Sequence, residues 1–155
     1  MRGPPEIRPA RAADLPELAG LVGRYWAFEA IPGFDPPRIR ALLERLLAEP
    51  ERGRAWLARS DAEPVGYLLG VYVLSFEHQG LTAEIDELFV LPEQRSRGIG
   101  AALLKDALAA FGSAGCTRVQ LQLARGNEAA RRFYHRHGFA ERQHYELLDR
   151  PLARG

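Results

Sequence analysis

The chain has 155 residues, of which 46% are hydrophobic and 26% are charged. This length fits one domain, and the composition is that of an ordinary folded protein, which excludes a disordered or fibrous chain. Twenty-one Lys and Arg against 20 Asp and Glu leave a net charge of +1, so no broad electrostatic field favours nucleic acid or an anionic membrane. We therefore expect a single domain over residues 1–155 that holds any polyanion locally.

The compartment is predicted from cysteine content and apolar runs. Cys116 is the only cysteine, which excludes an intrachain disulfide and gives no sign of an oxidising environment. The first residues are polar, and the most apolar run, VGYLLGVYVLSF, is shorter than the roughly 18 residues that span a bilayer. We expect a cytoplasmic protein without a membrane or nucleic-acid partner, and we leave a homodimer open.

The first half of the chain predicts two helices and four strands. Asp14, with Glu17 three residues later, predicts a capping box at the start of a helix over residues 14–28. Asp35 is expected to cap a second helix over residues 35–49. Strands are expected over residues 6–10, 54–60, 65–76 and 81–91, with short turns joining the last three.

The second half predicts a crossover followed by a helix and a strand. A helix from Ile99 to Gly112 lies between the strand over residues 81–91 and another over 117–124, an arrangement typical of parallel neighbours. The remaining elements are a helix over 127–137, closed by Gly138 and Phe139 as a Schellman motif, and a last strand over 142–150. The predicted fold is mixed α/β (α+β): a mostly antiparallel twisted sheet with one parallel, splayed pair and about four flanking helices.

The stretch PEQRSRGIG lies where the strand over residues 81–91 gives way to a helix. A helix N-terminus presents amides without intrahelical partners, and Gly98 and Gly100 let a phosphate approach the backbone closely. Arg95 and Arg97 add positive charge locally. The stretch therefore predicts a phosphate-binding loop, although a tight turn is the alternative. Neither a Walker A loop nor a dinucleotide fingerprint fits these letters.

Arg95-x-x-Gly98-x-Gly100 resembles the signature of the GNAT superfamily of acyl-CoA-dependent N-acyltransferases. The preceding ELFVLPE and the later NEAARRFYHRHGF resemble that family's flanking strand and its Asn-to-Tyr helix, so the motifs cover about residues 84–139. The resemblance implies a GNAT fold, acetyl-CoA as cofactor and transfer of an acetyl group to an amine.

The resemblance also implies which residues hold coenzyme A. The loop would bind its pyrophosphate, and pantetheine would lie between the splayed strands, bonded to the backbone of three strand residues. The cofactor-binding residues implied in this way are Phe89, Val90, Leu91, Arg95, Ser96, Arg97, Gly98, Ile99, Gly100, Ala101, Asn127 and Tyr134.

Asn127 and Tyr134 are seven residues apart, which places them on nearly one face of a helix. The resemblance implies that Asn127 contacts the cofactor and that Tyr134 is the catalytic acid that protonates the leaving thiolate. A phenol with a pKa of about 10 can protonate a thiolate whose conjugate acid has a pKa of about 8.5. The alternatives are an N-cap role for Asn127 and a packing role for Tyr134.

A protonated amine must lose a proton before it attacks, and a carboxylate is the natural base. The strand AEIDELFV supplies Glu84, Asp86 and Glu87. Alternation places Glu84 and Asp86 on one face and Glu87 on the other, unless a bulge intervenes. We interpret Glu84 as a solvated strand end and expect Asp86 or Glu87 to be the base. Backbone N–H groups near Val90 would stabilise the developing oxyanion.

The acceptor is predicted from the segment RYWAFEAIPGF. Phe28 and Phe34 would form aromatic walls and Glu29 would bind an ammonium group. The alternative is that Trp26 and Phe28 are core residues and that Glu29 is solvated. This favours a small-molecule or amino-acid-like amine. A catalytically silent acyl-CoA-binding module and an acetyltransferase acting on a protein or on charged tRNA are the alternatives.

The four histidines do not predict a metal site. His135 and His137 are two residues apart on the predicted helix and do not share a face, and the other two histidines lie elsewhere. We therefore expect no bound metal.

Overall fold

The computed structural model describes residues 3–154. The chain divides into two compact units, Met1–Gln122 and Leu123–Gly155. The prediction of a single domain over residues 1–155 stays a prediction. No helix in the described part of the chain is long and apolar enough to span a bilayer.

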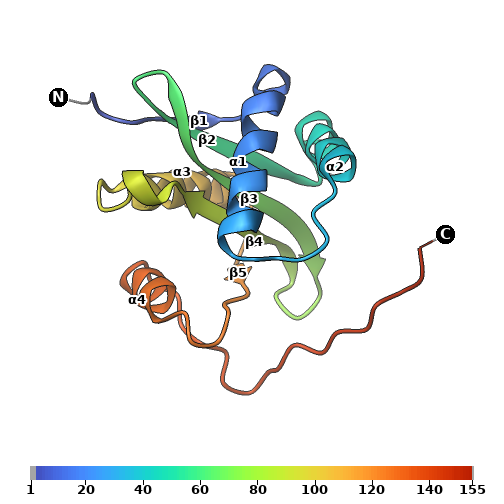
Figure 1. Cartoon of the computed structure of the whole chain (residues 1–155). Helices are drawn as coiled ribbons and strands as arrows, with labels where there is room; N and C mark the ends of the chain where they lie inside the picture. The colour runs from blue at the N-terminus through green and yellow to red at the C-terminus, as the bar shows by residue number, and fades with distance from the viewer. Residues whose placement is uncertain (1–2, 155) are drawn as a thin grey trace. The chain divides into compact units, whose positions relative to one another are not determined.

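Within the described residues of the first unit, five strands form one sheet in the order β1-β2-β3-β4-β5 (Figure 1). Neighbours from β1 to β4 pair antiparallel, and β5 pairs parallel with β4. This confirms the predicted mixed sheet with one parallel pair. The strands are β1 (Glu6–Pro9), β2 (Gly53–Ser60), β3 (Glu63–Ser75), β4 (Gly80–Val90) and β5 (Val119–Leu121).

Helices lie on both faces of this sheet. On one face lie α1 (Leu15–Phe28) and α2 (Pro36–Ala48), and on the other lies α3 (Ile99–Ser113) (Figure 1). Asp35 caps α2 as predicted, because its carboxylate accepts a hydrogen bond from the Arg38 amide at 3.2 Å. The helix α3 continues past Gly112, where we expected its end. It stops before Gly115, whose φ of 90° is readily adopted by glycine.

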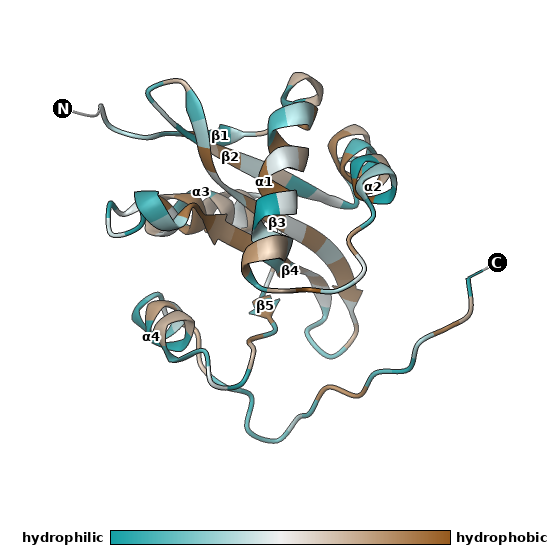
Figure 2. Cartoon of the chain, viewed as in Figure 1, coloured by the Kyte–Doolittle hydropathy of each residue, from teal (hydrophilic) through white to brown (hydrophobic). Residues whose placement is uncertain are grey.

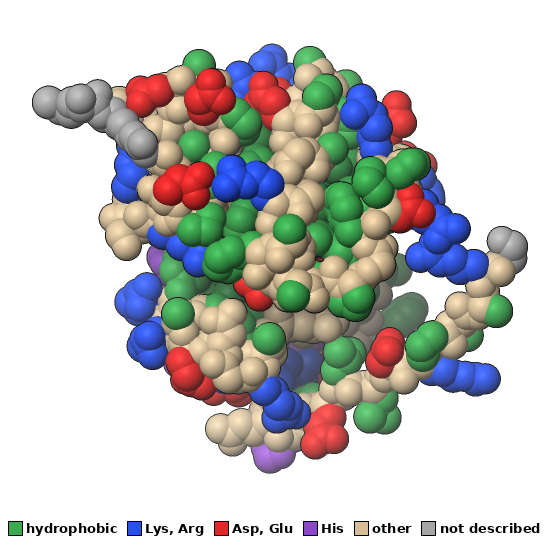
Figure 3. Space-filling view, in the orientation of Figure 1, with side chains coloured by type: hydrophobic (Ala, Val, Ile, Leu, Met, Phe, Trp, Pro, Cys, Tyr) green, Lys and Arg blue, Asp and Glu red, His purple; other side chains and the backbone are tan. Residues whose placement is uncertain are grey.

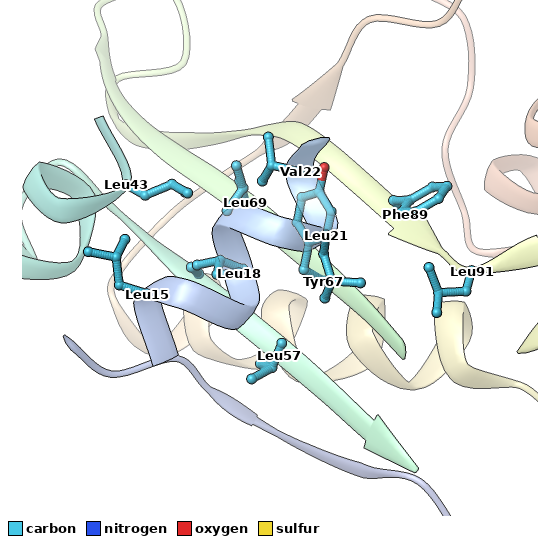
Figure 4. Close-up of a cluster of buried hydrophobic side chains, with 11 residues drawn as sticks. Leu15, Leu18, Leu21, Val22, Leu43, Leu57, Tyr67, Leu69, Phe89 and Leu91 are labelled. Carbon is cyan, nitrogen blue, oxygen red and sulfur yellow. The ribbon is translucent and has the colours of Figure 1, made fainter. Parts of the chain in front are cut away.

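Alternation along the strands gives each face its own apolar layer. Beneath α1, Leu18, Leu57 and Tyr67 are buried in one cluster (Figure 4). Beneath α3, Phe111 packs edge-on against Trp56 with ring centroids 5.4 Å apart. Figure 2 shows the central strands in brown between these layers. The apolar residues of both strand faces are thus removed from water, which is the main stabilising contribution to the fold.

A bulge in β4 decides which way its carboxylates point. Leu69 of β3 pairs with Glu87, whereas the next residue of β3 pairs with Ile85, so Asp86 has no partner on β3. One extra residue reverses the alternation that follows it. Glu84 and Glu87 therefore share the face covered by α1, and the bulge-free prediction that they lie on opposite faces is wrong.

Asp14 does not form the predicted capping box with Glu17. Its buried carboxylate instead accepts hydrogen bonds from the guanidinium of Arg8, at 2.6 and 2.8 Å, and from the backbone amide of Arg11, at 2.8 Å. Glu17 forms an ion pair with Arg59 at 2.7 Å. A guanidinium from β1 satisfies both carboxylate oxygens at once, which an amide of the helix cannot do. Asp14 thus joins the end of β1 to the start of α1.

The second unit contains the helix α4 (Glu128–Arg136), and both predicted ends of this helix are confirmed. The side-chain oxygen of Asn127 accepts a hydrogen bond from an amide of the first turn at 3.1 Å. At the other end Gly138 has a φ of 89°, and the Phe139 amide donates to the Tyr134 carbonyl at 3.0 Å. This is the Schellman hydrogen bond.

The last strand, predicted over residues 142–150, does not form. These residues have no regular structure apart from a turn at 143–144, and Leu147 and Leu148 are exposed. Figure 2 shows both teal and brown along the C-terminal segment, so apolar residues are present there. A strand also needs a hydrogen-bonding neighbour, which a pattern of letters cannot supply. For the same reason β5 is shorter than the predicted strand over 117–124.

Candidate active site

The loop between β4 and α3 contains a run of backbone amides without acceptors. The Arg95 amide donates to the Pro92 carbonyl at 3.3 Å, and the next amide with an acceptor is that of Ala102, which donates to the Gly98 carbonyl at 3.0 Å. Within residues 3–154, the N–H groups of residues 96–101 have no hydrogen-bond partner. These groups lie at the N-terminus of α3, where the helix dipole favours an anion.

Two residues with positive φ turn the chain into α3. Ser96 has a φ of 67° and Gly98 a φ of 77°. A Cβ on Gly98 would meet nothing within 4 Å, so the backbone angle, and not a neighbouring atom of this chain, favours glycine there. The space beside Gly98 is open, and the adjacent amides are free donors. This geometry fits a diphosphate group.

The two arginines of the loop are engaged by the protein itself. Arg97 donates to the Gln94 side chain at 2.6 Å and to the Ser60 hydroxyl at 3.0 Å, so it ties the loop to the end of β2. The Nε of Arg95 donates to the Val90 carbonyl at 3.1 Å, and its guanidinium carbon lies 4.7 Å from the centre of the Phe28 ring. Both guanidinium groups are held by contacts that the sequence did not indicate, and their predicted role in binding phosphate stays a prediction.

Only part of β4 is paired on the β5 side, because β5 pairs with residues 83–85 alone. Of the three residues predicted to hold pantetheine, Leu91 has its amide bonded to the Val65 carbonyl at 2.9 Å. Antiparallel alternation turns the backbone groups of Phe89 toward β3 as well. The backbone groups of Phe89 and Leu91 thus lie on the β3 side, and the predicted role of all three residues in holding pantetheine stays a prediction. Val90 has its backbone groups on the open edge, and the same alternation places those of Leu88 there.

The carboxylates of β4 differ in their surroundings. Glu87 is half-buried, and one oxygen accepts from the Tyr67 hydroxyl at 2.7 Å while the other accepts from the Trp26 indole at 3.0 Å. Burial raises the pKa of the Glu87 carboxyl, and the two hydrogen bonds act in the opposite direction. Asp86 keeps more of its surface exposed, but neighbouring protein atoms still raise the pKa of its carboxyl. Glu84 accepts from the Gln122 side chain at 3.3 Å.

The predicted acceptor residues lie at and just beyond the end of α1. Phe28 is 51% exposed, and its ring lies 6.0 Å from that of the buried Phe89. Phe34 packs against Trp26 with ring centroids 5.5 Å apart. Glu29 is exposed at the end of the helix. The structure thus brings the aromatic residues of this segment close to β4, next to the indole that binds Glu87.

In the second unit, Tyr134 is partly buried between two aromatic side chains. Its ring lies 5.1 Å from that of Phe133 and 5.5 Å from that of Phe139. Asn127 uses its side-chain oxygen as the cap of α4. The alternative role considered for Asn127, an N-cap, is therefore present, and the cofactor role of both residues stays a prediction.

No group of three or more His, Cys, Asp and Glu within the described residues could hold a metal ion. Acidic and basic side chains are interspersed on the face that Figure 3 shows.

A comparison with protein families decides which family these features belong to. Residues 20–139 match the model of the acetyltransferase (GNAT) family. The chain belongs to the GNAT family. An uncharacterized N-acetyltransferase of Archaeoglobus fulgidus is 33% identical over 131 residues, which cover 83% of this chain and 88% of that protein.

Solved structures agree with the GNAT fold. An integron cassette protein from the mobile metagenome of Cole Harbour Salt Marsh has a TM-score of 0.85 and 29% identity, covering 96% of this chain and 91% of its own. The aminoglycoside N-acetyltransferase AAC(6')-Iy in complex with CoA has a TM-score of 0.81 and 19% identity, covering 100% of this chain and 97% of its own. The similarity to the aminoglycoside N-acetyltransferase shows a shared fold only.

Sequence reasoning missed Tyr67 as a partner of a site residue in this GNAT chain, and it did not link Trp26 to Glu87. Tyr67 lies in the apolar stretch VGYLLG, where a tyrosine is typical of a strand core. A buried tyrosine hydroxyl needs a hydrogen-bond partner, and this was the signal available. The partner itself, 20 residues further along the chain, required the pairing of β3 with β4.

Proposed function

We propose that this GNAT protein transfers an acetyl group from acetyl-CoA to a primary amine by direct attack. The observation that carries the proposal is the run of amides over residues 96–101 that have no partner within the described chain. The family match supports an acyltransferase, and the loop supports a cofactor that carries a diphosphate.

Residues of the loop and of β4 would hold acetyl-CoA. The amides between Ser96 and Ala101 would bind its diphosphate, and the open edge of β4 at Val90 would bind the pantetheine arm. The bound thioester supplies an activated acetyl group. The Val90 amide is a donor suited to the oxygen on which negative charge develops.

A carboxylate of β4 would act as the base. The acceptor arrives as an ammonium ion, and Glu87 or Asp86 would take one proton so that the nitrogen lone pair becomes available. The pKa of both carboxyls is raised, which makes each a better proton acceptor than a carboxylate with the ordinary pKa.

Tyr134 would act as the acid. Its hydroxyl would give a proton to the departing sulfur, and the second proton that the nitrogen loses as the amide forms would restore the phenol, so that the neutral amide and thiol are the products and the base keeps the first proton until solvent removes it. Asn127, at the start of the same helix, would contact the cofactor. The resemblance of NEAARRFYHRHGF to the family motif supports both assignments.

The acceptor is a small molecule with a primary amine, or an amino-acid-like compound. Phe28 and Phe34 would provide aromatic walls, and Glu29 would attract the ammonium group. A net charge of +1 supports a small acceptor over a polyanion such as tRNA.

The test is to incubate the protein with acetyl-CoA and a library of primary amines and to follow acetylation by mass spectrometry. We expect at least one small amine to gain an acetyl group with stoichiometric release of free thiol. Coenzyme A binding without turnover on any amine would instead identify a silent binding module. Transfer only to a protein or to charged tRNA would contradict the proposed acceptor class.

A further inference from the structure

Three elements meet at the carboxylate of Glu87. The Tyr67 hydroxyl of β3 donates to one oxygen at 2.7 Å, and the Trp26 indole of α1 donates to the other at 3.0 Å. Both carboxylate oxygens are therefore bound by donors that are distant in the sequence: Tyr67 is 20 residues from Glu87, and Trp26 is 61 residues from it. Such an arrangement fixes the plane of the carboxylate, because each donor restricts a different oxygen.

The surroundings hold Tyr67 in place. Its side chain is fully buried, and its ring lies 6.4 Å from that of Tyr25 and 6.2 Å from that of Phe89. In Figure 4 its hydroxyl oxygen, drawn in red, lies on the side of the ring away from Leu57. Burial and the charge of Glu87 raise the pKa of the Tyr67 phenol, so it remains a donor.

Asp86, the neighbouring carboxylate, has no such restraint. Within residues 3–154 no hydrogen bond or ion pair binds its side chain, and it is the extra residue of the bulge. A side chain without partners samples several rotamers and presents no fixed proton acceptor. This difference distinguishes Glu87 from Asp86 as the candidate base, a choice that the sequence left open.

We propose that Tyr67 and Trp26 are positioning residues that hold Glu87, and not Asp86, as the ionised base for the amine of the acceptor. The assignment of Glu87 as the base rests on the proposed function. The pair of hydrogen bonds from Tyr67 and Trp26 to Glu87, called the clamp below, does not. The other ionisable groups that act on this cluster are Tyr25 and Glu29 of α1 and Asp86 of β4. Each is neutral or negative, so the two donors are what stabilise the charged form of Glu87.

The clamp can be tested without an activity assay, because Trp26 reports on its acceptor. In ¹⁵N-labelled full-length protein we expect the indole N–H signal of Trp26 to titrate with pH, with a midpoint above the ordinary glutamate range. Trp56 is the internal control: it is buried on the α3 face, and its signal should stay constant. The titration should vanish in Glu87→Gln and persist in Asp86→Asn.

Tyr67→Phe removes one donor and keeps the ring. Loss of a hydrogen bond to an ionised carboxylate should raise the midpoint by roughly one pH unit, because the charged form loses stabilisation. Tyr72→Phe is the matched control, since Tyr72 lies on the same strand and packs against Phe111 on the opposite face. A Trp26 signal that does not titrate, or an equal midpoint in Tyr67→Phe and the wild type, would overturn the clamp.

The base assignment is tested by the pH profile of kcat/KM. Activity requires ionised Glu87. The acidic limb of the kcat/KM profile should therefore move to higher pH in Tyr67→Phe by about the same amount as the NMR midpoint, and the limb should also move to higher pH in Trp26→Phe. A destabilised fold alone would lower the rate at every pH. A limb that stays in place while the NMR midpoint moves would overturn Glu87 as base. No acetyl transfer by the wild type would overturn the proposed function and the base assignment together, while the NMR result would still report on the clamp.

Discussion

The carboxylates of Glu84 and Glu87 share the α1 face because Asp86 is an extra residue in β4. The sequence shows three carboxylates in this strand, and alternation assigns each of them to a face of the sheet. That assignment changes with the position of a bulge, and no residue in AEIDELFV marks where the bulge occurs. The donors to Glu87 also come from other elements. At the scale of single residues, chemical type was predictable from the sequence, whereas orientation and partners required the pairing of β3 with β4.

Tyr134→Phe tests the acid assigned to the second unit. The ring packs between Phe133 and Phe139, so removal of the hydroxyl should leave α4 and the affinity for coenzyme A unchanged. General acid catalysis typically contributes at least about 100-fold, and kcat should fall by that order. Steady-state kinetics and calorimetry measure the two quantities. Tyr145→Phe, in the exposed C-terminal segment, is the control; equal kcat for Tyr134→Phe and this control would remove the role.

Helices were more predictable than strands at the scale of elements. Caps are local signals, and those of Asp35, Asn127 and Gly138 are all present in the structure. The strand expected over residues 142–150 fails because pairing is not local. Asp14 shows a competition between local signals, in which a guanidinium from β1 takes the carboxylate that was expected to cap α1.

The junction of β1 and α1 should make stability depend on pH. Hydrogen bonds from the Arg8 guanidinium, chiefly, lower the pKa of Asp14 from 3.8 to about 2. A lowered folded-state pKa contributes stability that is present above pH 3.8 and is lost as the pH falls through about 2. Asp14→Asn should therefore lower the free energy of unfolding by about 2 kcal/mol at pH 7, on the scale of 1.36 kcal/mol per pKa unit.

Denaturant titrations at pH 7 and at pH 2–3 check this. The difference between Asp14→Asn and the wild type should shrink toward zero at the lower pH. Asp35→Asn is the matched control, because 45% of the Asp35 side chain is exposed and asparagine also caps helices well. A deficit for Asp14→Asn that is the same at both pH values would show that lost packing, and not charge, explains it.

At the scale of the whole molecule, the fold and the family were visible early because their signals are short and contiguous. Arg95-x-x-Gly98-x-Gly100 and the helix that follows lie within one stretch, and the sheet predicted around them is confirmed. The acceptor was not visible in the same way. Its predicted residues lie in an aromatic segment that also serves the core, where Trp26 packs against Phe34 and binds Glu87.

The central claim is that the amides of residues 96–101 bind the diphosphate of coenzyme A, and calorimetric titration of Gly98→Val with coenzyme A tests it most directly. A valine at a φ of 77° is strained by roughly 1–2 kcal/mol, so Gly115→Val, at a φ of 90° beyond the other end of the same helix, is the matched control. Thermal melts of both variants verify that they remain folded. We predict that Gly98→Val loses affinity at least about tenfold, as expected from one or two lost hydrogen bonds to a charged group, while Gly115→Val binds like the wild type. Wild-type affinity in folded Gly98→Val would contradict the account.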